Sequence, residues 1–158
     1  MKLVIPHTIA LRPEVAALGT DLGAEFCDLT GDDAGYVRLF DRLWSEGAAF
    51  INNEQDVLAS PELLKALWAC PDELCSGYYM QGGYRVMYTL ACVKFSTGLI
   101  ARLPDAMKNA AGRTNGVKPY NMLDLALVSP SGVLPTSGAS THVHEPAMLH
   151  LHGAPLPR

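Results

Sequence analysis

The sequence predicts a single-domain α/β fold in which a mostly parallel sheet is flanked by helices. The first 70 residues alternate between short apolar runs and helical patterns, an order that favours parallel neighbouring strands. The length of 158 residues suits one domain, and 49% of the residues are hydrophobic, which is enough for a buried core. No internal repeat or linker divides the chain.

The first half of the chain carries the clearest element signals. Pro13 and Pro61 each open a helical pattern, and Ser60 precedes the second one as a capping hydroxyl. Pro6 and Gly19 are expected to end the first strand and the first helix. We expect strands at residues 3–5, 24–27 and 48–51, and helices at residues 13–18, between Asp33 and Gly47, and from Pro61 to about Cys70.

The second half predicts less regular structure, because Gly, Ser and Pro are frequent there. We expect an extended segment at residues 77–92, helices at residues 95–103 and 122–128, and loops at residues 110–118 and 129–140.

Charge and hydropathy exclude some classes of function. The net charge of −4 argues against a protein that selects its partner by bulk attraction to phosphate, such as a nonspecific nucleic-acid binder. The run from Leu3 to Ile5 is too short for a signal peptide, and no stretch approaches the roughly 20 apolar residues of a membrane span. We therefore expect a cytoplasmic protein without a membrane span.

The four cysteines are expected to be reduced thiols of the core, because no export signal is present. None of them forms a C-x-x-C pair, which argues against a Cys/His zinc finger. A disulfide between Cys70 and Cys75 is allowed by the sequence but is not implied by it.

Two carboxylates follow the third expected strand. Glu54 and Asp56 lie two residues apart, just where the apolar run 48–51 ends. Ligands of open α/β sheets bind beyond the carboxyl ends of the strands, and extended spacing would direct both side chains to the same side. Oxygen ligands of this kind suit Mg²⁺ or Mn²⁺. The alternative interpretation is a solvated turn before a capped helix.

Four of the five histidines lie near the C-terminus, at His142, His144, His150 and His152. Histidine is the commonest side-chain ligand of metals, and packing does not require it at this density. Strand alternation would place the first two on one face, and likewise the last two. We expect at least one of them to take part in a site; adventitious metal binding is the alternative.

Together these segments resemble the GT-A class of nucleotide-diphospho-sugar glycosyltransferases. The strand ending in Ile5-Pro6 resembles the first, nucleotide-side strand of that class. Segment 50–56 lies where the class carries its D-x-D-type motif after an apolar strand. In this resemblance Glu54 takes the first acidic place and Asp56 the second, and Asp56 is the surer metal ligand.

The end of the chain adds to the resemblance. Residues 148–153 look like the His-x-x-Gly of glycogenin-like and related galactosyltransferases, in which a late histidine completes the metal site. The match implies that His150 is that ligand and that Gly153 lets the backbone approach the diphosphate. The implied architecture is a minimal, Rossmann-like GT-A domain, with a nucleotide-binding half at residues 1–76 and a half for the acceptor and the metal at residues 77–158.

The activity implied by the resemblance is metal-dependent transfer of a sugar from a nucleotide-diphospho-sugar donor. Asp56, Glu54 and His150 would hold Mn²⁺ or Mg²⁺ against the donor diphosphate, whose departure develops negative charge. The acceptor class is open: a small molecule, a glycan, a protein or a modified nucleic acid.

Further residues of the expected donor site follow the first strand. Pro6, His7, Thr8 and Arg12 are expected to meet the nucleoside or the phosphates, although His7 also fits a loop histidine with no task. Asp124 lies among apolar residues of an expected helix, and we expect it to be the general base for the acceptor hydroxyl. A helix-face acid bonded to a nearby loop is the alternative for Asp124.

Two other functional classes fit the same residues. A metal-dependent hydrolase would use the His and Asp ligands with a metal-bound water, and would turn over without an acceptor. A non-catalytic module would keep a shortened nucleotide-sugar fold and bind a nucleotide or another protein.

Overall fold

The computed structural model describes residues 1–87, 89–113, 123 and 126–151. The strands of the main sheet are β1 Leu3–His7, β2 Glu25–Asp28, β3 Phe50–Asn53, β5 Leu74–Ser76, β8 Cys92–Phe95 and β9 Thr141–Val143. They lie in the order β2-β1-β3-β8-β5-β9. Two small sheets join β4 Val57–Leu58 with β10 Leu149–His150, and β6 Tyr79–Gln81 with β7 Tyr84–Val86.

The sheet is mixed, with parallel pairs at both ends. Strand β1 is parallel to β2 and to β3, and β5 is parallel to β9. Strand β8 is antiparallel to both of its neighbours, β3 and β5. The α/β class and the parallel arrangement of the first three strands are therefore confirmed, whereas the reversal at β8 has no signal in the sequence.

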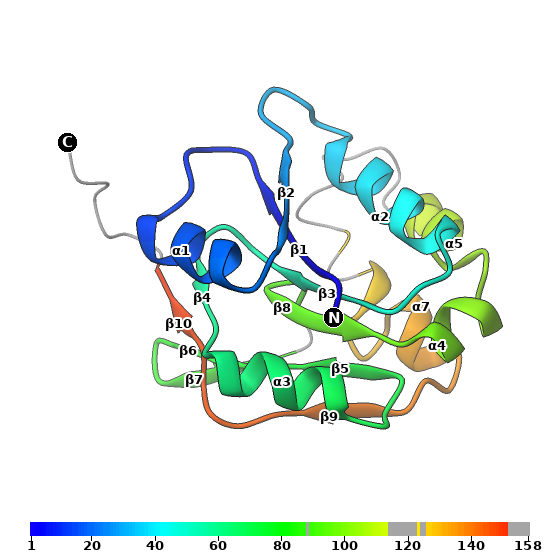
Figure 1. Cartoon of the computed structure of the whole chain (residues 1–158). Coiled ribbons are helices and arrows are strands. Elements are labelled where there is room, and N and C mark those ends of the chain that lie inside the picture. The colour runs from blue at the N-terminus through cyan, green and yellow to red at the C-terminus, as the bar shows by residue number, and fades with distance from the viewer. Residues whose placement is uncertain (88, 114–122, 124–125, 152–158) are drawn as a thin grey trace.

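Helices cover both faces of the sheet (Figure 1). Leu3 and Ile5 of β1 belong to the apolar cluster under two of the described helices, and Val4 belongs to the cluster under the other described helices. This alternation follows from the two-residue period of a strand. The helices on the first face are α1 Pro13–Asp21 and α3 Pro61–Ala69; those on the second are α2 Gly35–Ser45, α4 Thr97–Arg102, α5 Ala106–Arg113 and α7 Val133–Thr136.

The first strand and the first helix both run further than expected. Strand β1 continues through Pro6, because its pairing with β3 ends at Val4 and the missing N–H of proline is tolerated where one side is unpaired. Helix α1 continues past Gly19. A Cβ on Gly19 would lie 2.6 Å from the Phe26 ring and 2.7 Å from Ile5 Cδ1, so this glycine lets the helix approach the sheet closely.

Three expectations for the second half of the chain are wrong in part. Phe95 lies in β8 and not in a helix, and α4 begins at Thr97 with the Ser96 hydroxyl as its cap. Residues 110–113 of the expected loop belong to α5, and α7 lies within the expected loop 129–140. Apolar residues explain both helices, because they pack into the core on the α2 face.

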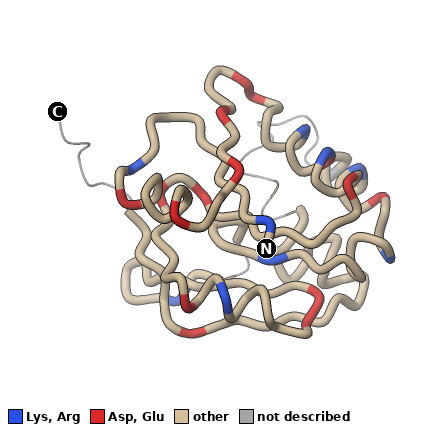
Figure 2. Tube along the Cα trace, viewed as in Figure 1, with Lys and Arg blue, Asp and Glu red and all other residues tan. Residues whose placement is uncertain are grey.

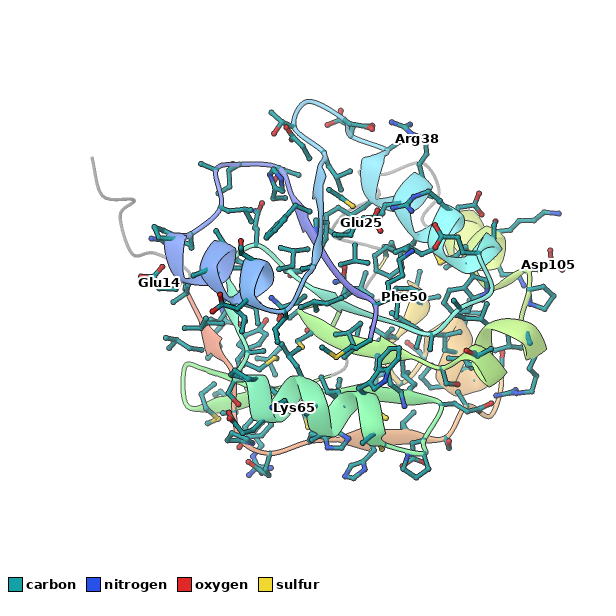
Figure 3. The ribbon with its side chains drawn as sticks, viewed as in Figure 1. Glu14, Glu25, Arg38, Phe50, Lys65 and Asp105 are labelled. Carbon is teal, nitrogen blue, oxygen red and sulfur yellow. The ribbon has the colours of Figure 1, made fainter. Side chains whose placement is uncertain are left out.

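Aromatic residues form the centre of the core on the α2 face. Phe50 of β3, labelled in Figure 3, points toward α2, and its ring centroid lies 5.8 Å from that of Phe40 and 5.0 Å from that of Phe95. The Trp44 indole N–H donates to the Leu103 carbonyl at 2.8 Å. Basic and acidic residues are scattered over the described trace, which shows no continuous basic stripe in Figure 2. Each helix of the described residues is too short or too polar to cross a membrane.

Candidate functional site

The loops after β1 and β3 are joined at the carboxyl ends of these two parallel strands. The backbone N–H groups of Thr8 and Ile9 donate to the Gln55 side-chain oxygen at 2.7 and 3.3 Å. The carboxyl end of a parallel strand pair is the usual ligand side of an open α/β sheet. Thr8, expected at the donor site, therefore lies against the segment that carries Glu54 and Asp56.

The segment after β3 is a turn and not an extended strand, which corrects the expected geometry of the two carboxylates. The Val57 N–H donates to the Glu54 carbonyl at 3.1 Å, and the Glu54 N–H donates to the Ala91 carbonyl at 2.8 Å. Two-residue alternation therefore does not apply to Glu54 and Asp56. Glu54 lies near Cys92: burial raises the pKa of the Cys92 thiol, and the charge of Glu54 raises it further.

Buried Asn53 fixes this turn from inside. Its side-chain N–H groups donate to the Glu54 carbonyl at 3.1 Å and to the Val57 carbonyl at 2.9 Å. The two carbonyl groups that accept these bonds lie on either side of Asp56 in the sequence. An asparagine at the end of a buried strand is the sequence signal for such a turn, because an unpaired buried amide is costly.

Pairing of β4 with β10 brings Asp56 and His150 together. His150 pairs with Val57 in the antiparallel register, and the Leu151 N–H donates to the Asp56 carbonyl at 2.8 Å. His150 Nε2 lies 3.8 Å from Asp56 Oδ2, and the two side chains expose 10% and 18% of their area. Two expected metal ligands from distant parts of the sequence thus share one half-buried position.

Two further side chains surround this pair. The Tyr79 ring stacks on the His150 imidazole, with centroids 4.2 Å apart and planes 11° apart, and it fixes the orientation of the histidine. Arg12, which precedes α1, donates to the Leu151 carbonyl at 3.0 Å. Gln55, Asn53 and Tyr79 are absent from the sequence expectation, since no spacing rule links them to His150.

The remaining expected residues are distributed as follows. Pro6 lies within β1 and pairs with Cys27. His7 ends β1; its Nδ1 atom is buried without a hydrogen-bond partner in the part of the chain that the structure describes, and lies 4.0 Å from Asp28 Oδ1. Asp124 and Gly153 lie outside the described residues.

The Asp56–His150 pair fits a divalent cation. Ligands of Mg²⁺ lie roughly 2.1 Å from the ion, and nitrogen ligands of Zn²⁺ lie about as close, so two ligands of one ion are at most about 4.2 Å apart. The observed 3.8 Å lies between the roughly 3.0 Å that separates adjacent octahedral ligands and this upper limit for opposite ligands, so a small rotation of either side chain would let both bind one ion. A carboxylate with an imidazole is a mixed donor set that suits Mn²⁺ better than Mg²⁺, which takes oxygen ligands.

Two surface hollows among the described residues lie away from this pair. One is lined by residues of α4, α5 and α7, including Arg102, Asn109 and Val133. The other lies between β2 and α2 and includes Cys27 and Arg38. Neither is lined by Asp56 or His150, and the candidate site is defined by the chemistry of its side chains.

Comparison with known proteins gives a likeness in structure only. No protein-family model and no curated protein matches the sequence. The structure is similar to that of a glycosyltransferase involved in the glycosylation of the major capsid of PBCV-1, with a TM-score of 0.53, 12% identity, and coverage of 92% of this chain and 81% of that chain. It is also similar to A197 from STIV, with a TM-score of 0.49, 12% identity, and coverage of 65% and 68%. The chain therefore shares the α/β fold of the PBCV-1 glycosyltransferase, in agreement with the fold that the sequence resemblance implies.

Proposed function

We propose that this protein transfers a sugar from a nucleotide-diphospho-sugar to an acceptor, with Mn²⁺ held by Asp56 and His150. The observation that carries the proposal is the 3.8 Å approach of these two side chains at the carboxyl end of β3. The likeness in fold to a glycosyltransferase supports it, because ligands of such sheets bind at this edge.

The described residues have separate tasks in this proposal. Asp56 and His150 hold the cation, which would neutralise the charge that develops on the departing nucleoside diphosphate. Tyr79 keeps the imidazole in one orientation by stacking. The Thr8–Gln55 bond keeps the loop after β1 against the proposed metal-binding turn. Arg12, which donates to the Leu151 carbonyl just after β10, is the cation proposed to contact a phosphate.

Three roles rest on the sequence alone. Glu54 is proposed as a further metal ligand and Asp124 as the general base. Gly153 is proposed to let the backbone come close to the diphosphate. Pro6 and His7 are proposed to line the nucleoside side. Variants of these residues are tested in the same assay as variants of Asp56 and His150.

The test begins with thermal unfolding in the presence of nucleoside diphosphates and nucleotide-sugars, with and without Mn²⁺. A ligand at about 100 times its Kd adds about 2.7 kcal/mol, which raises the Tm of a domain of this size by several degrees. We expect one nucleotide to raise the Tm only with Mn²⁺, and Asp56→Asn and His150→Gln to abolish the shift. Asp33→Asn is the matched control, because Asp33 is an exposed acid before α2.

Turnover separates this function from its alternatives. Nucleoside diphosphate release that requires an acceptor supports transfer. Release of nucleoside diphosphate at the same rate without any acceptor indicates a hydrolase. A Tm shift without any release indicates a binding module. Either result would contradict the proposed transfer.

A further inference from the structure

A second group of potential metal ligands lies under the end of α3, beside the edge strand β9. Cys70 follows the last residue of α3, Cys75 lies on β5, and His142 on β9 is its register partner. Figure 1 shows α3 running alongside β5 and β9. Asp72 lies in the connection from α3 to β5, and His144 follows β9.

Three of these side chains already have the spacing of ligands around one zinc ion. Cys70 Sγ lies 3.4 Å from His142 Nδ1 and 3.7 Å from Asp72 Oδ2, and the latter two atoms are 3.6 Å apart. Tetrahedral Zn²⁺, with bonds of about 2.3 Å to sulfur and about 2.0–2.1 Å to nitrogen or oxygen, places neighbouring ligands roughly 3.4–3.6 Å apart. The three distances therefore lie within about 0.3 Å of the edges of such a tetrahedron.

A second triad shares Cys70. The ligand atoms of Cys70, Cys75 and His144 all lie within 4.8 Å of one another. The His142 and His144 rings stack with centroids 4.2 Å apart, so both histidines stand on the same side of the edge strand. His144 Nε2 is buried and has no hydrogen-bond partner among the described residues. A buried ring nitrogen without a partner is costly, and a ligand at this position would remove the cost.

The charges of the surroundings also suit a zinc thiolate. Lys94 exposes 4% of its area and donates to the Cys70 carbonyl at 2.5 Å, but it forms no ion pair within 4.0 Å in the described part of the chain. Two thiolates would cancel the charge of Zn²⁺, and the Asp72 carboxylate would then balance Lys94.

We propose that this group is a structural zinc site, in which Zn²⁺ is bound by Cys70 and three of the four side chains Asp72, Cys75, His142 and His144. Cys₂His₂ sets and related mixed sets are usual for structural Zn²⁺, and soft thiolates exclude Mg²⁺. The site is independent of the proposed sugar transfer. Its ligands join the end of α3, strand β5 and the edge strand β9.

Zinc would secure the segment that leads to the candidate active site. Strand β9 has one neighbour in the sheet, β5, and exposes most of its residues. The chain continues from His144 to β10, which carries His150. A metal bond from β9 to the end of α3 would add to the three residue pairs that join β9 to β5.

The test is the zinc content of the whole protein, purified in reducing buffer without chelators and measured by inductively coupled plasma mass spectrometry. We expect one Zn²⁺ per chain in the wild type and a loss of at least about tenfold in Cys70→Ser. The double variant His142→Ala, His144→Ala is expected to lose zinc as well. Cys27→Ser is the matched control, because Cys27 lies on β2 at the other edge of the sheet.

Cobalt replacement gives a result that misfolding of a variant cannot imitate. Wild-type protein loaded with Co²⁺ is expected to show a thiolate charge-transfer band that Cys27→Ser retains. A wild type that neither contains nor takes up zinc, a cobalt spectrum without thiolate character, or a Cys70–Cys75 disulfide in the reduced preparation would each overturn the zinc site.

Discussion

The β4–β10 region and the β5–β9 region use histidines from the same C-terminal segment for different chemistry. His150 meets the Asp56 carboxylate beside an aromatic ring, whereas His142 and His144 meet two thiols, one carboxylate and a buried lysine. Oxygen donors select hard cations and thiolates select zinc. In the two proposed sites, the partner contributed by the fold, and not the histidine, would therefore decide which metal is bound.

The two regions also differ in how they are supported. The turn with Asp56 is held by polar bonds, from Asn53 inside and from Thr8 across to Gln55. The thiol region lies at the margin of an apolar cluster formed by α3 and the sheet. We therefore expect polar substitutions to disturb the first region and loss of the metal to disturb the second.

The largest expected effect is that single substitutions impair the function of one region and leave that of the other intact. Asp56→Asn is expected to lower sugar transfer at least about 100-fold, because removing a direct ligand should exceed the effect known for second-sphere partners, and to leave the zinc content at one per chain. Cys70→Ser is expected to lose zinc and to lower transfer by less than about tenfold. Transfer rates and zinc content of both variants are the measurements.

The same pair of variants can break the comparison. If Asp56→Asn loses zinc, or if Cys70→Ser lowers transfer as strongly as Asp56→Asn, the two regions form one functional unit.

A smaller effect is expected from Asn53→Ala, which removes both side-chain bonds that brace the turn. The Glu54 carbonyl keeps its bond from the Val57 N–H, whereas the Val57 carbonyl loses its side-chain donor. An unpaired buried carbonyl costs about 1–3 kcal/mol, so the free energy of unfolding in urea should fall by about that amount. The Mn²⁺-dependent Tm shift should weaken, while zinc content stays the same. The control is Asn109→Ala, because Asn109 is an exposed residue of α5. An equal loss of unfolding free energy in both variants would show that the Asn53 side chain does not stabilise the turn.

The smallest effect is expected far from both regions, at Glu46. The hydrogen bond from Lys2 lowers the pKa of the Glu46 carboxyl below its usual value of 4.5. Because the folded pKa is the lower one, the stabilisation is present above pH 4.5 and disappears as the pH falls through the folded pKa. Glu46→Gln should lower stability at pH 7 by less than about 1 kcal/mol, as for other exposed pairs.

Urea unfolding of Glu46→Gln and the wild type at a series of pH values measures this difference. A difference that grows toward acid would contradict the assigned sign. Sugar transfer and zinc content should be those of the wild type at every pH where the protein is folded.

Local patterns in the sequence predict much of the fold. The Ser60 cap with Pro61 begins α3 as expected, and the alternation of apolar runs predicts the parallel strands β1, β2 and β3. The exceptions have tertiary causes. A glycine is found inside α1 because a side chain at position 19 would collide with Ile5 and Phe26. Strand β1 continues through Pro6 because one side of the strand is unpaired there.

The sequence by itself determined the fold class, most of the helices and strands of the first half, and the type of side chain available at the carboxyl end of β3. It also marked Asp56 and His150 as one set, through a family resemblance. These features depend on residue type and on short spacings along the sequence, so they can be recognised without the tertiary structure.

Only the tertiary structure decided which residues meet. Antiparallel pairing of β4 with β10 joined Asp56 to His150, and parallel pairing of β5 with β9 joined His142 to Cys75. The sequence argued against a Cys/His zinc finger because its cysteines lack paired spacing, yet Cys70 and Cys75 lie together with the histidines in the structure. The reason is physical: strand pairing and helix packing set distances between residues that are remote along the chain, and no local spacing encodes them.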